Sequence, residues 1–182
     1  QGLVDYVAGH VEADVTELVT EDAPLESAVQ PTGLDTPGQL SLCPARASFE
    51  RLAQAKTAGA AEKLEKQIAA IALSHDVVLV DTPPVASNQA VAAVNAVDRV
   101  IAVTPDTERG EDALARLTAR VADVGETLDA VVATYASGES VVTDADARVP
   151  ESETQAPRAC PATLDGESAL ATAGATAART AV

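Results

Sequence analysis

One acidic residue, Asp81, follows directly after an unbroken apolar run, Val77–Val80. A run rich in β-branched residues is typical of a strand buried on both faces of a parallel sheet. Open α/β sheets bind their ligands at the carboxyl ends of such strands, which is where Asp81 would lie. A carboxylate in that place can hold a Mg²⁺ ion through the water shell of the metal. The structural alternative is that Asp81 simply caps a loop or a helix.

The remaining candidate groups are better explained by structure than by chemistry. A cluster of acids fits a capped, solvated helix start better than a metal site: Asp106, Glu108, Glu111 and Asp112. His75 fits a surface connection between a helix and a strand. Cys43 and Cys160 belong to no CxxC or Cys/His pattern, so we expect free buried thiols rather than a metal centre.

Strands alternate with helices from Val77 onward, which predicts a right-handed parallel βαβ sheet. The expected strands are Val77–Val80, Arg99–Val103 and Leu128–Ala133. The expected helices between them are Asn88–Val97, capped by Ser87, and Glu108–Asp123, capped by Thr107.

The segments on either side are less regular. Helical patterns cover residues 2–9, 15–29 and 47–74, and a short strand is expected at Gln39–Cys43 after the Pro31–Gly38 loop. Residues 136–168 are polar, with one apolar point at Val149-Pro150, and residues 170–182 predict a terminal helix. We expect one α/β domain over residues 1–182.

Acidic residues are spread along the whole chain and give a formal net charge of −16. Abundant Asp and Glu, scarce Lys and a core of small residues resemble cytoplasmic proteins of halophiles, whose self-repulsion is screened by molar salt. Such a surface argues against DNA binding through a broad basic face. No apolar run is long enough to span a membrane.

Residues 75–134 resemble the ParA/MinD/CobQ (CobQ/CobB) family of P-loop ATPases. That family has a strand and switch of the form (Y/H)D-apolar₄-D-x-P-P, then a helix ending in A-D and a strand of the RVIAVT kind. The matching residues are Asp76, Val77–Val80, Asp81, Pro83, Pro84, Asp98 and Arg99–Thr104.

The resemblance implies a fold, two cofactors and a set of site residues. The fold is three-layered, with a mostly parallel sheet flanked by helices on both faces, and the cofactors are ATP and Mg²⁺. Asp81 would be the Walker B acid that holds Mg²⁺ through water. Thr82, Pro83 and Pro84 would form the switch that senses the γ-phosphate. The base would be bordered by Thr134 and by the loop Pro150, Glu151 and Ser152.

The sequence departs from the family in two places. It has no K-G-G-x-G-K-[ST] run, so the backbone cradle and lysines of the P-loop are missing. Many members also place Asn-Arg after the third strand, with the Asn amide reading adenine; Thr134 and Tyr135 stand there instead. Because the chain begins at Gln1 rather than Met, we expect the first strand and the P-loop helix in a preceding segment. The alternative is a relative that has lost them.

Two functions follow. The first is a cytoplasmic ParA/MinD-like ATPase of the chromosome-partitioning, plasmid-partitioning or division-positioning type, a homodimer in the intact family, that does not hydrolyse ATP in this form. The second is a non-catalytic interaction or dimerisation module that no longer binds nucleotide. A different doubly wound enzyme that uses Asp81 is a weaker third possibility, because no second acid or nucleophile accompanies it.

Overall fold

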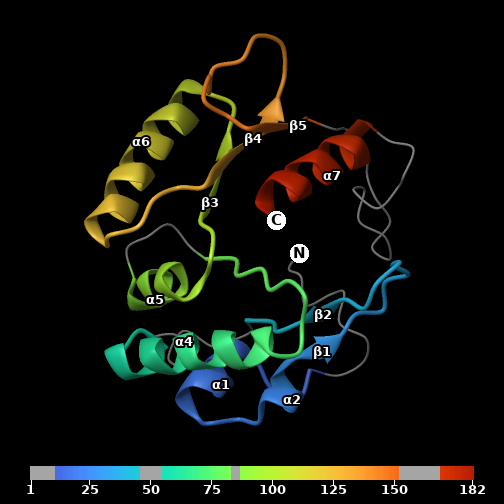
Figure 1. Cartoon of the computed structure of the whole chain (residues 1–182), viewed down its shortest axis with the longest axis vertical. Helices are drawn as coiled ribbons and strands as arrows, with labels where there is room; N and C mark the ends of the chain where they lie inside the picture. Colours follow the sequence, from blue (N-terminus) through green and yellow to red (C-terminus); the bar gives the residue numbers. More distant parts are fainter. Residues whose placement is uncertain (1–10, 46–54, 83–86, 152–168) are drawn as a thin grey trace. The chain divides into compact units, whose positions relative to one another are not determined.

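A computed structural model of the chain describes residues 11–45, 55–82, 87–151 and 169–182 (Figure 1). The chain divides into two compact units, Gln1–Ala96 and Val97–Val182, which are described separately. One domain over residues 1–182 therefore stays a prediction.

The second unit is built on a parallel sheet of three strands. Strands β3 (Ile101–Pro105), β4 (Ala130–Ala136) and β5 (Ala147–Pro150) lie in the order β3-β4-β5, so β4 is central. Val103 is paired with Val132, and Val132 is paired with Ala147. The predicted α/β class with a parallel sheet is confirmed, and the strands predicted near residues 99–103 and 128–133 begin about two residues later.

Helices cover both faces of this sheet, as predicted. Helix α6 (Glu108–Asp123) and helix α7 (Ala169–Ala181) lie on opposite sides of it (Figure 1). Thr107 caps α6 by accepting a hydrogen bond from the Gly110 N–H at 3.1 Å, and Glu108 and Glu111 occupy the first turn. The predicted cap and the predicted terminal helix are both confirmed.

Small residues let α6 approach β3 closely. Thr104 is buried, and its hydroxyl donates to the Gly110 carbonyl oxygen at 2.9 Å. A Cβ at Gly110 would lie 1.9 Å from the Pro105 carbonyl oxygen, so this position admits no side chain without movement of the backbone. The contact explains why a glycine occupies the first turn of a helix.

The first unit contains short helices and a small antiparallel pair. Helix α1 (Val15–Thr20) begins with a capping box: the Asp14 carboxylate accepts from the Glu17 N–H at 2.9 Å, and the Glu17 carboxylate accepts from the Asp14 N–H at 3.1 Å. The other elements are α2 (Leu25–Ala28), β1 (Gln30–Pro31), β2 (Ser41–Leu42), α4 (Ala58–Ala72) and α5 (Asn88–Ala96). None of the described helices is long and apolar enough to cross a membrane.

Two predicted helices of this unit are interrupted. The pattern at residues 15–29 is divided between α1 and α2, because Asp22 has a positive φ of 55° and Pro24 precedes α2. The pattern at residues 47–74 is broken at Thr57, whose side chain caps α4 by accepting from the Ala60 N–H at 3.3 Å. Residues 2–9 and 47–54 lie outside the described residues, whereas the Ser87 cap of α5 is confirmed at 3.3 Å from the Ala90 N–H.

The predicted strand Val77–Val80 is wrong. The segment has no strand pairing, and the side chains of Val77 and Leu79 are 52% and 79% exposed. An apolar run indicates that a segment can be buried. A buried strand also needs neighbouring strands that form hydrogen bonds with its N–H and C=O groups. Among the described residues no strand pairs with this run.

Strand β3 departs from the prediction in a related way. A parallel strand covered by helices on both faces would be buried throughout, but the burial of β3 alternates and Val103 is 66% exposed. Among the residues that the structure describes, β3 is an edge strand that is paired only with β4. Strand β5 was not predicted, because it has four residues and two of them are Arg148 and Pro150.

We expect Gly110→Ala to destabilise the protein by about 1–3 kcal/mol, because the new methyl group meets backbone rather than a movable side chain. Gly59→Ala in α4 is the matched control: nothing lies within 4 Å of its Cβ position, so we expect no loss and a gain of up to about 1 kcal/mol. Denaturant unfolding of both variants in molar KCl measures the difference. Equal stability of the two variants would contradict the close contact.

Candidate functional site at the carboxyl edge of the sheet

The parallel register brings three strand ends to one edge. Pro105 of β3 is paired with Thr134 of β4, and Ala136 of β4 is paired with Pro150 of β5. The Glu151 N–H then donates to the Ala136 carbonyl oxygen at 3.4 Å. Thr134 and Pro150, which lie on adjacent strands, and Glu151, which directly follows β5, are thus at the edge where α/β sheets bind ligands.

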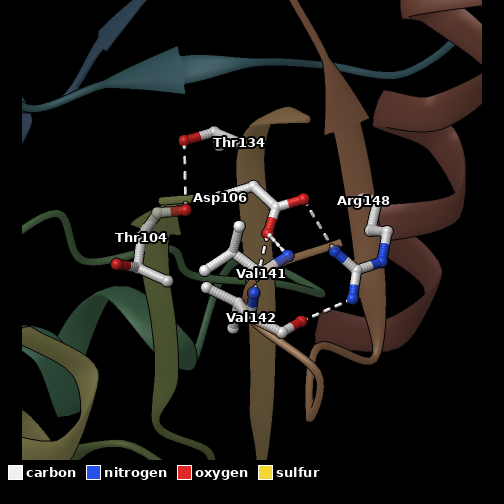
Figure 2. Close-up of polar contacts among 6 residues, drawn as sticks. All are labelled: Thr104, Asp106, Thr134, Val141, Val142 and Arg148. Carbon is white, nitrogen blue, oxygen red and sulfur yellow. Dashed lines mark hydrogen bonds and ion pairs between the residues drawn. The ribbon is translucent and has the colours of Figure 1, made fainter. Parts of the chain in front are cut away.

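A network centred on Asp106 organises this edge (Figure 2). The Asp106 N–H donates to the Thr134 carbonyl oxygen at 2.8 Å, which extends the pairing of β3 and β4 past Pro105. One carboxylate oxygen accepts from the N–H groups of Val141 and Val142 at 3.0 and 2.8 Å. The other accepts from Arg148 of β5 at 2.9 Å, and Arg148 also donates to the Val142 carbonyl oxygen.

These contacts account for the electrostatics of Asp106. The Val142 N–H lowers the pKa of the carboxyl group most, Val141 and Arg148 lower it further, and burial opposes them. The carboxylate side chain is 3% exposed and that of Arg148 is 31% exposed. Asp106 was predicted to belong to a solvated helix start; it is instead a covered anchor whose two oxygens are both occupied.

Thr134 and Tyr135 end the central strand in an unusual conformation. The Thr134 hydroxyl donates to the Thr104 carbonyl oxygen at 3.3 Å (Figure 2). Tyr135 has a φ of 54° and its side chain is 66% exposed. A bulky residue rarely adopts a positive φ, and holding one there costs on the order of 1–3 kcal/mol. The pairing shifts at this point, since Thr134 and Ala136 are paired with the consecutive residues Val149 and Pro150.

The remaining predicted residues lie elsewhere in the chain. Asp81 is exposed and Thr82 is half-buried, at the end of the unpaired segment of the first unit. Pro83, Pro84 and Ser152 lie outside the described residues. The role of Asp81 as a Mg²⁺ ligand through water therefore stays a prediction. Among the described residues, no group of three possible ligands could hold a metal ion directly.

Cys43 is free, as expected, but half-buried rather than buried, and His75 follows a helix, as expected, but the strand expected after it does not form. Cys43 is a free, half-buried thiol, and burial, followed by the charge of Asp14, raises its pKa to about 11. A thiol with so high a pKa is a poor nucleophile at neutral pH. His75 follows α4, and its Nδ1 lies 3.1 Å from the Ile71 carbonyl oxygen. Cys160 lies outside the described residues.

Sequence reasoning missed Arg148 and the conformation of Tyr135. Arg148 lies in a short strand, and its partner Asp106 is far away along the chain, so no local pattern could have paired them. Tyr135 had been noted only as a replacement for a family residue. No local signal predicts a positive φ for tyrosine.

The fold is similar to that of two solved MinD structures. The cell division ATPase MinD of Pyrococcus furiosus matches with a TM-score of 0.76 and 18% identity, over 94% of this chain and 76% of that one. The septum site-determining protein MinD of Pyrococcus horikoshii OT3, in complex with Mg-ADP, matches with a TM-score of 0.75 and 19% identity, over 96% and 75%. No family model and no curated protein matches the sequence. The chain thus has a MinD-like P-loop NTPase fold, and identities this low show the fold alone.

We expect Asp106→Asn to destabilise the protein at neutral pH and to speed hydrogen exchange at the Val141 and Val142 amides. The native pKa of Asp106 is lowered, so its stabilisation is present above the ordinary carboxyl pKa of about 3.9 and is lost as the pH falls through the lowered value. The stability difference between wild type and variant should therefore be largest near pH 7 and shrink below about pH 4.

The control for this test is Asp112→Asn, which removes the same charge from an exposed position on α6. Denaturant unfolding across pH and amide exchange measure both variants. Equal effects of the two substitutions, or a difference that grows in acid, would contradict the anchoring role of Asp106.

Proposed function

We propose that this chain belongs to a ParA/MinD-like nucleotide-dependent switch protein and that the chain binds nucleotide without hydrolysing it. The observation that carries the proposal is the carboxyl edge of a MinD-like sheet, where Thr134 and Pro150 lie on neighbouring strands and Glu151 directly follows the second of them. The complex of Pyrococcus horikoshii MinD with Mg-ADP supports a nucleotide as the ligand of such a fold.

The residues of this chain fit the two ends of a nucleotide differently. The carboxyl edge offers an exposed ring, a half-buried hydroxyl oxygen and a proline, which suit a base. The phosphate end needs a glycine-rich cradle and lysines, and the sequence has no such run. Asp81 would hold Mg²⁺ through water, and Thr82–Pro84 would form the switch that senses the γ-phosphate. Mg²⁺ would neutralise part of the charge of the ATP phosphates. The residues named here do not provide the groups that hydrolysis of ATP requires.

A second candidate is a non-catalytic interaction module, and a specific observation favours it. Val77 and Leu79 expose apolar side chains on an unpaired segment of the first unit, and Val103 does so on an edge strand of the second. Burying such groups against a partner, including a second copy of the chain, would stabilise an assembly. The acidic composition speaks against DNA as that partner. A cytoplasmic, halophilic protein that acts in partitioning or division positioning is the setting we propose for either role.

We expect Mg-ATP to raise the melting temperature of the full chain in molar KCl without measurable release of phosphate. At a ligand concentration one hundred times Kd, the gain is about 2.7 kcal/mol, or roughly 5–10 °C for a chain of this size. Asp81→Ala should reduce the Mg²⁺-dependent part of the shift, since the exposed carboxylate has no packing role.

The matched control is Asp76→Ala, which removes an exposed acid at the other end of the same apolar segment and should leave the shift unchanged. No thermal shift with ATP would favour the interaction module. Turnover that Asp81→Ala abolishes would contradict the absence of hydrolysis.

A further inference from the structure

Tyr135 combines three properties that no other described residue shares. It is an aromatic residue at the carboxyl end of the central strand, it has a φ of 54°, and its side chain is 66% exposed. The chain has very few aromatic residues, two Tyr, one Phe and no Trp. Because the ring is exposed, packing of the ring in the described structure does not compensate for the unfavourable backbone conformation.

The surrounding backbone holds Tyr135 in this conformation. On one side, the Thr134 carbonyl oxygen accepts from the Asp106 N–H at 2.8 Å. On the other, Ala136 is paired with Pro150 and accepts from the Glu151 N–H at 3.4 Å. Tyr135 is therefore the extra residue of a bulge in β4, and bulges near functional sites commonly redirect one side chain. Unfavourable backbone conformations of this kind are concentrated at ligand sites.

From this geometry we infer that Tyr135 binds the base of a purine nucleotide by stacking, and that it does so without distinguishing adenine from guanine. The inference rests on the proposed nucleotide binding and concerns how the base is recognised. Every nucleobase has a flat π-face, so stacking on an aromatic ring tolerates differences in base identity. Purines present a larger face than pyrimidines and gain more from it.

The lack of discrimination follows from the neighbouring Thr134. Reading adenine by hydrogen bonds requires a donor and an acceptor side by side, as an amide provides. The Thr134 hydroxyl already donates its hydrogen to the Thr104 carbonyl oxygen at 3.3 Å, so only its lone pairs are left for a ligand. An acceptor alone can meet the amino group of either adenine or guanine. Affinity at this edge thus depends on the ring rather than on a pattern of hydrogen bonds.

The test uses tyrosine fluorescence and calorimetry on the full chain in molar KCl with Mg²⁺. Tyr6→Phe leaves Tyr135 as the single tyrosine in a chain without Trp, so its emission reports on this ring alone. We expect ATP and GTP to quench that emission and to bind with Kd values within about threefold of each other. CTP should bind more weakly, and inorganic tripolyphosphate, which has no base, should not quench.

Substitutions at Tyr135 separate the ring from the backbone. Tyr135→Phe keeps the ring and should keep the ATP affinity within about twofold. Tyr135→Ala should weaken ATP and GTP binding alike by about tenfold or more, the size of one base stacked on one ring. Tyr135→Gly should weaken binding equally while raising the melting temperature, since glycine adopts a positive φ freely. Weaker binding by a more stable variant excludes misfolding as the cause.

The outcomes distinguish this inference from the proposed function. Wild-type affinity for ATP in Tyr135→Ala, or a preference for ATP over GTP of more than about tenfold, would overturn the stacking role and leave nucleotide binding intact. Absence of any ATP binding to the wild-type chain in calorimetry would overturn the proposed function and this inference together.

Discussion

The carboxylate of Asp106 holds together the carboxyl edge of the three-stranded sheet. Strands β4 and β5 are parallel, and the connection between them, residues 137–146, contains no helix. The backbone N–H groups of such a connection need partners outside it. Asp106 accepts two of them, and its ion pair with Arg148 ties the same point to β5. The chain has a formal net charge of −16, and its basic residue Arg148 thus stabilises this edge of the sheet.

The same edge depends on how completely each strand is paired. Strand β4 has neighbours on both sides, and its residues Ala130, Val132 and Ala133 are buried. In the described part of the chain strand β3 has one neighbour, and its Val103 is exposed although its sequence is as apolar as that of β4. In the first unit, Val77–Val80 is an unbroken apolar run that has no strand partner among the described residues, and it forms no strand. Apolar composition becomes a buried strand only where hydrogen-bonding neighbours are present.

This contrast explains which predictions succeeded. The caps at Ser87 and Thr107, helix α6 and helix α7 depend on contacts within a few residues, and the sequence predicted each of them. The pair of Asp106 and Arg148 depends on two segments that meet only after folding, as does the positive φ of Tyr135. Strand β5 was missed because its four residues carry too little periodicity. Thr134, Pro150 and Glu151, which the resemblance named, lie at one edge because parallel pairing fixes the register of the strands, and their role toward a base stays a prediction.

In the proposed function, binding of the base and hydrolysis of ATP depend on different parts of the chain. Residues at the carboxyl edge belong to the second unit and are held there by backbone pairing and by Asp106, independently of any phosphate-binding loop. Hydrolysis needs positioned donors around the phosphates, which a sequence without a glycine-rich lysine loop does not provide. Base recognition needs only a surface of the right shape and polarity, and in the proposed function the exposed ring of Tyr135 and the hydroxyl oxygen of Thr134 would supply it. Under the proposed function, the chain would therefore bind a nucleotide through its base without cleaving it.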